Sequence, residues 1–254
     1  MIGVSYGDFN MQANGVTVTG TDVYSAPTNN IQADELAERD GALIVQQKFQ
    51  KKAFKVEGLI RKATQLELEQ TLDAFKLAMS KKNQGFDVAY AGGIRRYLAS
   101  VQNNIISNRG ITSVGFSIEF LSPDGMGWDL QATTLISSAA NTTSNTTVSL
   151  SVGGSYKADP YIKVTVGVIT GGTSKTITLS NAATLRSIAV TRTWVAGDVL
   201  EVDALKGLVL VNGAASDFTG QLLSFEPGDG GLGYLDDFTT RSITITSSYT
   251  RRWL

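Results

Sequence analysis

The chain has 254 residues, a formal net charge of −1, and neither histidine nor cysteine. The lack of both residue types excludes disulfides, thiol nucleophiles, thiolate metal sites and every catalytic triad or metal site that needs an imidazole. Charged residues are shared evenly between the two halves, so no basic domain is present to neutralise nucleic-acid phosphates. We therefore expect no enzyme, no cofactor and no bound metal; a glycosidase-like carboxylate pair is the enzymatic alternative that stays open.

Residues 1–130 have the pattern of a β-rich domain. Asn14-Gly15 lies between apolar β-formers and predicts a tight hairpin turn, because such turns need a positive φ at both central residues. Apolar and polar residues alternate in 54–57, 86–90 and 114–120, which is typical of strands with one buried face. The turn residues and the period-2 pattern together predict an all-β architecture.

A single segment in this half, residues 64–80, has helical periodicity. Leu68, Leu72, Phe75 and Met79 fall on one stripe of a helix. Thr64 and Glu67 have the spacing of a capping box, in which each side chain accepts a hydrogen bond from an otherwise unpaired N–H group. We expect one amphipathic helix that covers a face of the sheet; a stripe that binds a partner is the alternative.

The densest basic cluster follows in the same domain. Its members are Lys48, Lys51, Lys52, Lys55 and Arg61, with Lys51 and Lys52 expected at the tip of a hairpin. A solvated hairpin edge that resists aggregation is one interpretation. Contact with a neighbouring acidic subunit, or with nucleic acid that passes by, is the functional alternative, so these residues are candidates for an oligomer interface or a lumen.

The composition shifts near residue 123, and residues 131–254 have the pattern of a β-sandwich. A Ser/Thr/Asn-rich run, 133–147, is either a linker or an edge strand with its loop. Short β runs follow at 162–166, 199–202 and 243–245. Asn212-Gly213 predicts a second tight hairpin turn. No apolar run approaches 18 residues, and the first residues lack the features of a signal peptide, so we expect no membrane insertion.

Two further patterns in this half suggest binding chemistry. Trp194 is a candidate for stacking on a sugar, since exposed aromatic residues on a β-sandwich form carbohydrate platforms; a half-buried packing role is the alternative. Asp229, Asp236 and Asp237 are candidates for a cation site, with an ordinary solvated turn as the favoured interpretation.

The order and spacing of several short motifs resemble the distal tail proteins of long, non-contractile-tailed (siphovirus-type) bacteriophages. In the first domain the motifs are Thr19-Gly20-Thr21-Asp22-Val23-Tyr24-Ser25-Ala26-Pro27, Arg39-Asp40-Gly41, Lys55-Val56-Glu57-Gly58-Leu59-Ile60, Leu72-Asp73-Ala74-Phe75-Lys76, Val88-Ala89-Tyr90, Arg95-Arg96-Tyr97-Leu98-Ala99 and Phe116-Ser117-Ile118-Glu119-Phe120 with Pro123 after it. In the second they are Gly197-Asp198-Val199-Leu200-Glu201-Val202-Asp203, Val211-Asn212-Gly213, Pro227-Gly228 and Arg251-Arg252-Trp253-Leu254. The chain departs from the family at Asp229, where relatives often have asparagine after Pro-Gly.

The resemblance implies a structural virion protein with two domains. It implies an N-terminal split β-barrel (1–130) with the helix 64–80 packed on it, and a C-terminal galectin-like β-sandwich (131–254). It also implies a homohexameric ring at the distal end of the tail that joins the tail tube protein to tail-tip, baseplate or receptor-binding proteins. DNA would pass through its lumen without specific binding, and the protein would be made in the host cytoplasm. A carbohydrate-binding module that contacts host glycans is the alternative function.

Overall fold

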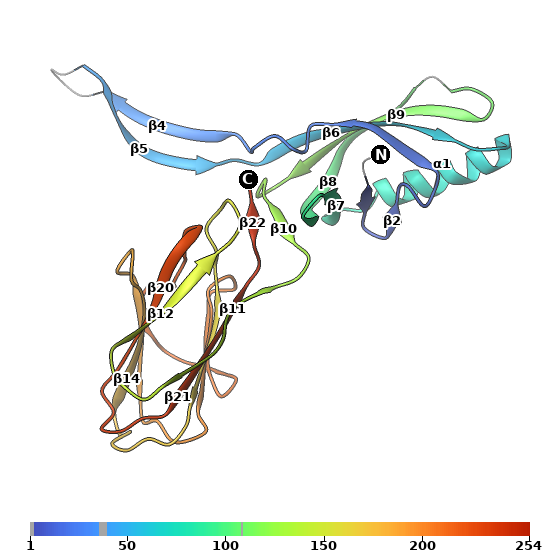
Figure 1. Cartoon of the computed structure of the whole chain (residues 1–254). Coiled ribbons are helices and arrows are strands. Elements are labelled where there is room, and N and C mark those ends of the chain that lie inside the picture. Colours follow the sequence, from blue (N-terminus) through green and yellow to red (C-terminus); the bar gives the residue numbers. More distant parts are fainter. Residues whose placement is uncertain (1–2, 36–39, 108) are drawn as a thin grey trace. The chain divides into compact units, whose positions relative to one another are not determined.

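The computed structural model describes residues 3–35, 40–107 and 109–254, and in them it is mainly β with one α-helix (Figure 1). Two compact units divide the chain, Met1–Leu130 with Leu254 and Gln131–Trp253. Each unit has its own hydrophobic core. Within the described residues, no helix is long and apolar enough to cross a membrane. Arg39, which belongs to one of the family-like motifs, lies outside the described residues.

The elements of the first unit are antiparallel strands and the helix. They are β1 (Val4–Tyr6), β2 (Phe9–Asn10), β3 (Val16–Thr21), β4 (Asn29–Glu35), β5 (Ala42–Phe49), β6 (Lys52–Arg61), α1 (Gln65–Met79), β7 (Gln84–Tyr90), β8 (Gly93–Ser107), β9 (Ser113–Ser122) and β10 (Gly127–Asp129). The main sheet has the order β2-β1-β7-β8-β9-β6-β3, with β10 paired to β8.

The long strand β8 connects the two parts of this sheet. Its first half pairs with β7 and its second half with β9, and the register shifts between Val101 and Asn103. A bulge of this kind bends a strand and increases its twist. The core on the inner face contains closely packed aromatic rings; those of Phe54 and Phe86, and of Phe86 and Phe120, have centroids 4.8 Å apart. The alternating pattern predicted for 114–120 is confirmed, because β9 alternates half-buried and buried residues throughout.

Helix α1 begins after Thr64, where the predicted capping box is present. The Thr64 side chain accepts from the Glu67 N–H, and the Glu67 carboxylate accepts from the Thr64 N–H. The predicted stripe is confirmed, since its residues are buried and the ring of Phe75 lies 5.1 Å from that of Phe116 on β9. The helix therefore covers the inner face of the sheet, the first of the two roles considered for it.

Replacing Thr64 with alanine is expected to lower the free energy of unfolding of the first unit by about 1 kcal/mol, because the helix start loses its side-chain acceptor. Amide exchange of α1 in the full chain, followed by mass spectrometry, measures the change. Thr64→Ser keeps a hydroxyl acceptor and is the matched control. Equal exchange of α1 in wild type and Thr64→Ala would show that the cap is not needed.

The hairpin predicted at Asn14-Gly15 is wrong. Gly15 has a φ of 72°, but Asn14 is not in the left-handed region, and the strands on either side pair with different partners. Asn10 explains the difference: its side chain accepts from the Ala13 N–H at 2.9 Å and its carbonyl accepts from the Asn14 N–H at 3.2 Å. These bonds form a compact turn that carries the chain from one edge of the sheet to the other.

The second unit is a sandwich of two antiparallel sheets. Its strands are β11 (Thr133–Asn141), β12 (Thr146–Val152), β13 (Tyr161–Val166), β14 (Lys175–Asn181), β15 (Ser187–Arg192), β16 (Val199–Asp203), β17 (Leu208–Val211), β18 (Ala214–Ala215), β19 (Thr219–Gly220), β20 (Gly228–Asp236) and β21 (Ile243–Tyr249). The last strand of the chain, β22 (Arg252–Trp253), belongs to neither sheet of the sandwich. One sheet has the order β11-β21-β13-β16-β17-β18 and the other β12-β20-β14-β15-β19. Inward residues of both sheets form the core. The turn predicted at Asn212-Gly213 is confirmed, with φ values of 54° and 78°.

Candidate assembly interface

The strands β4 and β5 form a hairpin that we call the arm (Asn29–Glu35 and Ala42–Phe49). Among the described residues they pair only with each other, and in Figure 1 they form a ribbon separate from the other strands of this unit. Nearly every described residue of the arm is exposed, including Ile31 (52%), Leu43 (59%), Ile44 (59%) and Val45 (54%). The arm is therefore an extended surface without a core of its own.

The register of the arm separates its side chains into two faces. Ala33 pairs with Ile44, and Ile31 pairs with Gln47, with a register shift that places Val45 in a bulge. Directly paired residues project from the same face of an antiparallel ribbon, and neighbours along a strand from opposite faces. One face consequently carries Asn29, Ile31, Ala33, Glu35, Ala42, Ile44, Gln47 and Phe49. The other carries Asn30, Gln32, Asp34, Leu43, Gln46 and Lys48.

The root of the arm is held by a buried lysine. Lys52, the first residue of β6, is 4% exposed and donates hydrogen bonds to the carbonyls of Val23 and Ser25. Its ammonium also lies 5.1 Å from the centroid of the Tyr97 ring. Burial lowers the pKa of Lys52 to about 8, an effect that the nearby Asp22 carboxylate partly opposes. The structure thus places one basic residue of the predicted cluster inside the unit.

The remaining residues of the basic cluster do not gather at one point. Lys48 is exposed on the arm and Lys51 is exposed at its root. Lys55 and Arg61 lie on the exposed face of β6, and Lys55 forms an ion pair with Glu57 at 2.6 Å. The expectation that Lys51 and Lys52 form a hairpin tip is wrong, because the arm turns between β4 and β5 and these lysines lie where its chain returns to the barrel.

A shallow groove that the sequence did not indicate crosses the exposed face of β6, β8 and β9. It has a volume of about 340 Å³, and Asp22, Lys55, Asn103, Ile105 and Glu119 are among its lining residues. Antiparallel pairing brings Lys55 opposite Glu119, and Glu119 opposite Asn103. These residues lie far apart in the sequence, so only the strand register reveals the groove.

Trp194 lies in the core of the second unit, so the expectation of an exposed ring is wrong. Its side chain is 2% exposed, and its indole N–H donates to the Lys175 carbonyl at 3.0 Å. The Arg192 guanidinium lies 5.4 Å from the ring centroid. The half-buried or buried packing role, considered as the alternative, is the observed one, and the carbohydrate-binding interpretation loses its contact residue.

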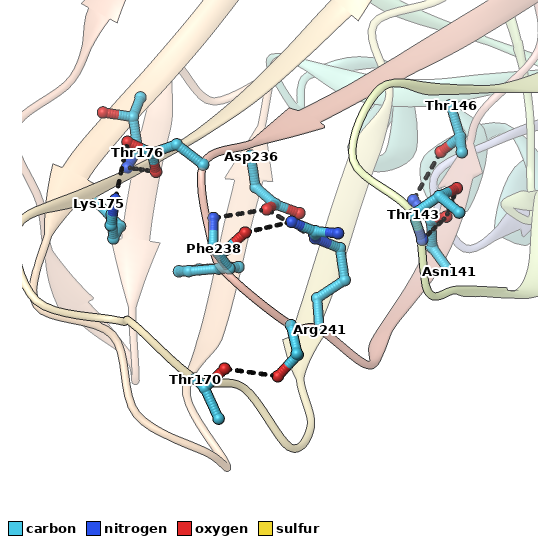
Figure 2. Close-up of polar contacts among 11 residues, drawn as sticks. Asn141, Thr143, Thr146, Thr170, Lys175, Thr176, Asp236, Phe238 and Arg241 are labelled. Carbon is cyan, nitrogen blue, oxygen red and sulfur yellow. Dashed lines mark hydrogen bonds and ion pairs between the residues drawn. The ribbon is translucent and has the colours of Figure 1, made fainter.

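The acidic residues near the end of β20 already have protein partners (Figure 2). Asp236 is buried, and its Oδ1 accepts from Arg241 Nε at 2.8 Å and from the Phe238 N–H at 2.9 Å. Asp237 accepts from the Thr176 N–H at 2.8 Å. The side chain of Asp229 falls outside the described residues. Within the part of the chain that the structure describes, no group of three or more acidic residues is arranged to hold a metal ion.

Comparison with known proteins finds a family model that matches most of the second unit and solved structures that are similar to the whole chain. Residues 153–253 match the family model of the siphovirus-type tail component, C-terminal domain. The whole chain is similar to the crystal structure of the Dit protein of phage SPP1, with a TM-score of 0.71, 12% sequence identity and coverage of 100% of both chains. That protein is described as a paradigm of the hub adsorption apparatus in phages that infect Gram-positive bacteria.

Two structures of the phage p2 baseplate in its activated conformation, with Ca and with Sr, also contain a similar chain. Their TM-scores are 0.49 and 0.46, each with 8% identity and with coverage of 99% of this chain and 98% of theirs. No curated protein sequence matches the chain. Residues 153–253 therefore match the siphovirus-type tail component family, and the whole chain shares the fold of the Dit protein; both findings agree with the resemblance to distal tail proteins predicted from the sequence motifs.

Proposed function

We propose that the chain is a structural protein of the phage tail, without enzymatic activity, that forms a ring of six copies at the distal end of the tail. The ring joins the tail tube protein to tail-tip, baseplate or receptor-binding proteins and leaves a channel for DNA. The family match and the similarity to a hub protein support the tail assignment. A net charge of −1 supports passage of DNA without specific binding.

The arm is the observation that carries this proposal. An isolated two-stranded hairpin is marginally stable in water, and contiguous exposed apolar residues mark interaction surfaces. The face with Ile31 and Ile44 has no partner among the described residues of its own chain. We assign this face to a second copy of the chain. An arm that binds a different surface on its neighbour makes a head-to-tail contact, and such contacts generate a ring when the rotation from copy to copy closes.

The domain roles follow from the same argument. We propose that the first unit, which bears the arm, builds the ring, and that the second unit, proposed to be galectin-like, projects from it toward the other tail proteins. The protein would then be found at the tail tip of the virion after its synthesis in the host cytoplasm. Negative-stain images of the purified protein and of virions test the ring and its place.

A paired set of arm variants tests the interface. Ile31→Ser with Ile44→Ser removes the apolar contacts, and the protein is expected to become monomeric in size-exclusion chromatography with light scattering. Gln32→Ser with Gln46→Ser alters the opposite face and is expected to leave assembly intact. Because neither pair touches the core, circular dichroism should be unchanged. A wild-type monomer at high concentration, or an apolar variant that assembles like wild type, would contradict the proposal.

A further inference from the structure

The chain enters and leaves the arm through two segments that lie side by side. Residues 22–28 lead into β4, and residues 50–51 lead from β5 into β6. The Gln50 N–H donates to the Thr28 carbonyl at 2.8 Å and closes the root. Beyond this bond, the direction of the arm depends on how the entering segment is fixed to the barrel.

Lys52, the first residue after the segment that leaves the arm, makes that connection. Its ammonium is directed back to the entering segment, where it donates to two carbonyls, those of Val23 and Ser25. The turn that contains Gly125 packs against the same place: a Cβ at Gly125 would lie 2.9 Å from the Pro27 Cβ and 3.1 Å from the Lys52 Cβ. There is consequently little free space around the lysine stem at the root.

Aromatic rings form a second layer beneath the root. The Tyr97 ring faces the Lys52 ammonium, and the Tyr97 hydroxyl lies 3.0 Å from that of Tyr90. The Tyr90 ring meets the half-exposed Tyr24 ring edge-on, with centroids 5.2 Å apart, and Arg95 lies 4.0 Å from the Tyr90 centroid. The entering segment is therefore fixed at three successive residues, by Lys52 at Val23 and Ser25 and by Tyr90 at Tyr24.

The charged and titratable groups around Lys52 do not form an ordinary ion pair with it. Its acceptors are backbone carbonyls; Asp22 of the entering segment attracts its charge, and Tyr97 of β8 faces it. Burying an ammonium in this way is costly, and an apolar side chain of similar length would avoid the cost. Packing alone therefore does not explain a lysine at this position. Its hydrogen bonds hold the Val23 and Ser25 carbonyls of the entering segment in place.

We propose that Lys52 is a positioning residue for assembly: it fixes the direction of the arm in the single subunit, before a second copy is bound. This inference rests on the proposed role of the arm. A rigid arm loses less conformational freedom when it docks, and preorganisation of this kind increases affinity. Loss of the lysine is expected to leave the barrel folded, loosen the arm, and weaken assembly by about tenfold.

The direction of the arm is measured by the distance between two spin labels. The chain has no cysteine, so Gln46→Cys on the arm and Gln70→Cys on the exposed side of α1 are unique labelling sites. All distances are measured in the Ile31→Ser/Ile44→Ser background, in which the arm is expected to have no docked neighbour, and each variant below is compared within that background. Labelled protein is diluted with unlabelled protein, so that only distances within one subunit are recorded. Wild type is expected to give a narrow distance distribution and Lys52→Met one at least about twice as wide. Lys51→Met, the exposed neighbour, is the matched control and should match wild type.

The pH dependence of amide exchange at the root of the arm provides a second test. Without Lys52 at the root, the exchange should show no such dependence. The pKa of Lys52 is about 8 when the root is closed and about 10.5 when the lysine is in water. Protons therefore favour the open root, and raising the pH from 7 to 9.5 should increase the amide protection of residues 22–28, after correction for intrinsic exchange rates. Lys52→Met should show no such increase.

The outcomes separate this inference from the proposed function. An unchanged distance distribution in Lys52→Met overturns the inference, whether or not the protein assembles. If Lys52→Met fails to fold, the pH dependence of the wild-type protein decides: greater protection of residues 22–28 at pH 9.5 than at pH 7 supports the inference, and equal protection overturns it. A broad distribution in Lys52→Met together with full assembly of Ile31→Ser/Ile44→Ser would instead contradict the interface and leave the positioning role intact.

Discussion

Replacing Asp236 with asparagine is expected to lower the free energy of unfolding of the second unit by about 3–5 kcal/mol. The Asp236 and Arg241 side chains are 0% and 12% exposed, and Arg241 also donates to the Phe238 carbonyl. Burial and the neighbouring Asp236 raise the pKa of Tyr234, so its hydroxyl stays protonated beside the carboxylate. Asparagine has nearly the same shape but no charge, and it leaves the Arg241 guanidinium buried without a counterion.

Chemical denaturation of the full chain, combined with amide exchange of residues 131–253, measures this loss in the second unit alone. Asp237→Asn is the matched control: its ion pair with Lys175 is longer, 3.9 Å, and its side chain is 53% exposed, so the change should be within about 1 kcal/mol. Asp236→Asn with Arg241→Met removes both charges and should recover part of the stability. Equal losses for Asp236→Asn and Asp237→Asn would contradict a special role for the buried pair.

Local patterns in the sequence predicted the elements whose neighbours are also local. The stripe and the capping box of α1 depend on residues within a few turns, and the alternation in β9 depends on one buried face. Asn212-Gly213 forms its turn because β17 and β18, the strands on either side of it, pair with each other. Asn14-Gly15 has the same two residues, but the strands beside it pair elsewhere, so a long-range choice of partners overrides the local signal.

The candidate interface was missed for a similar reason. Ala42-Leu43-Ile44-Val45 is an apolar run of the kind that buried strands contain, yet each of these residues is exposed. Only the fold reveals that this run belongs to a two-stranded hairpin and not to the main sheet. Lys51 and Lys52 are adjacent, and one is exposed while the other is buried, because strand side chains alternate between faces. The sequence could not indicate that Lys52 faces inward, or that the other basic residues do not gather at one point.

Asp198 illustrates the same limit in the second unit. It belongs to the family-like motif Gly197-Asp198-Val199-Leu200-Glu201-Val202-Asp203, and in the structure it is only 5% exposed. Its oxygens accept from the Val195 N–H at 2.9 Å and from Asn212 Nδ2 at 2.8 Å. The second partner, Asn212, lies in the hairpin turn that the sequence did predict. The sequence did not indicate that Asp198 contacts this turn.

Replacing Gly58 with alanine is expected to destabilise the first unit by about 3 kcal/mol or more. Gly58 lies in the middle of β6, opposite Phe116 of β9. A Cβ at this position would lie 2.3 Å from the Thr17 carbonyl oxygen and 2.5 Å from Phe116 Cζ. The Phe116 ring cannot move aside freely, because its other side packs against Phe75 of α1, so the added methyl group would disturb the strand and the helix together.

Gly20, on the neighbouring strand β3, is the matched control. No atom lies within 4 Å of the place where its Cβ would be, and its φ is outside the left-handed region, so Gly20→Ala should change the free energy of unfolding by no more than about 0.5 kcal/mol. Denaturation of both variants, with amide exchange to assign the change to residues 3–130, measures the difference between them.

A loss below about 1 kcal/mol for Gly58→Ala would mean that Phe116 repacks easily and that helix and sheet are held less tightly than their contacts imply. The large loss would instead show that Phe116 and α1 can pack on the sheet only because Gly58 has no side chain. It would also give a structural reason for the glycine in the family-like motif Lys55-Val56-Glu57-Gly58-Leu59-Ile60.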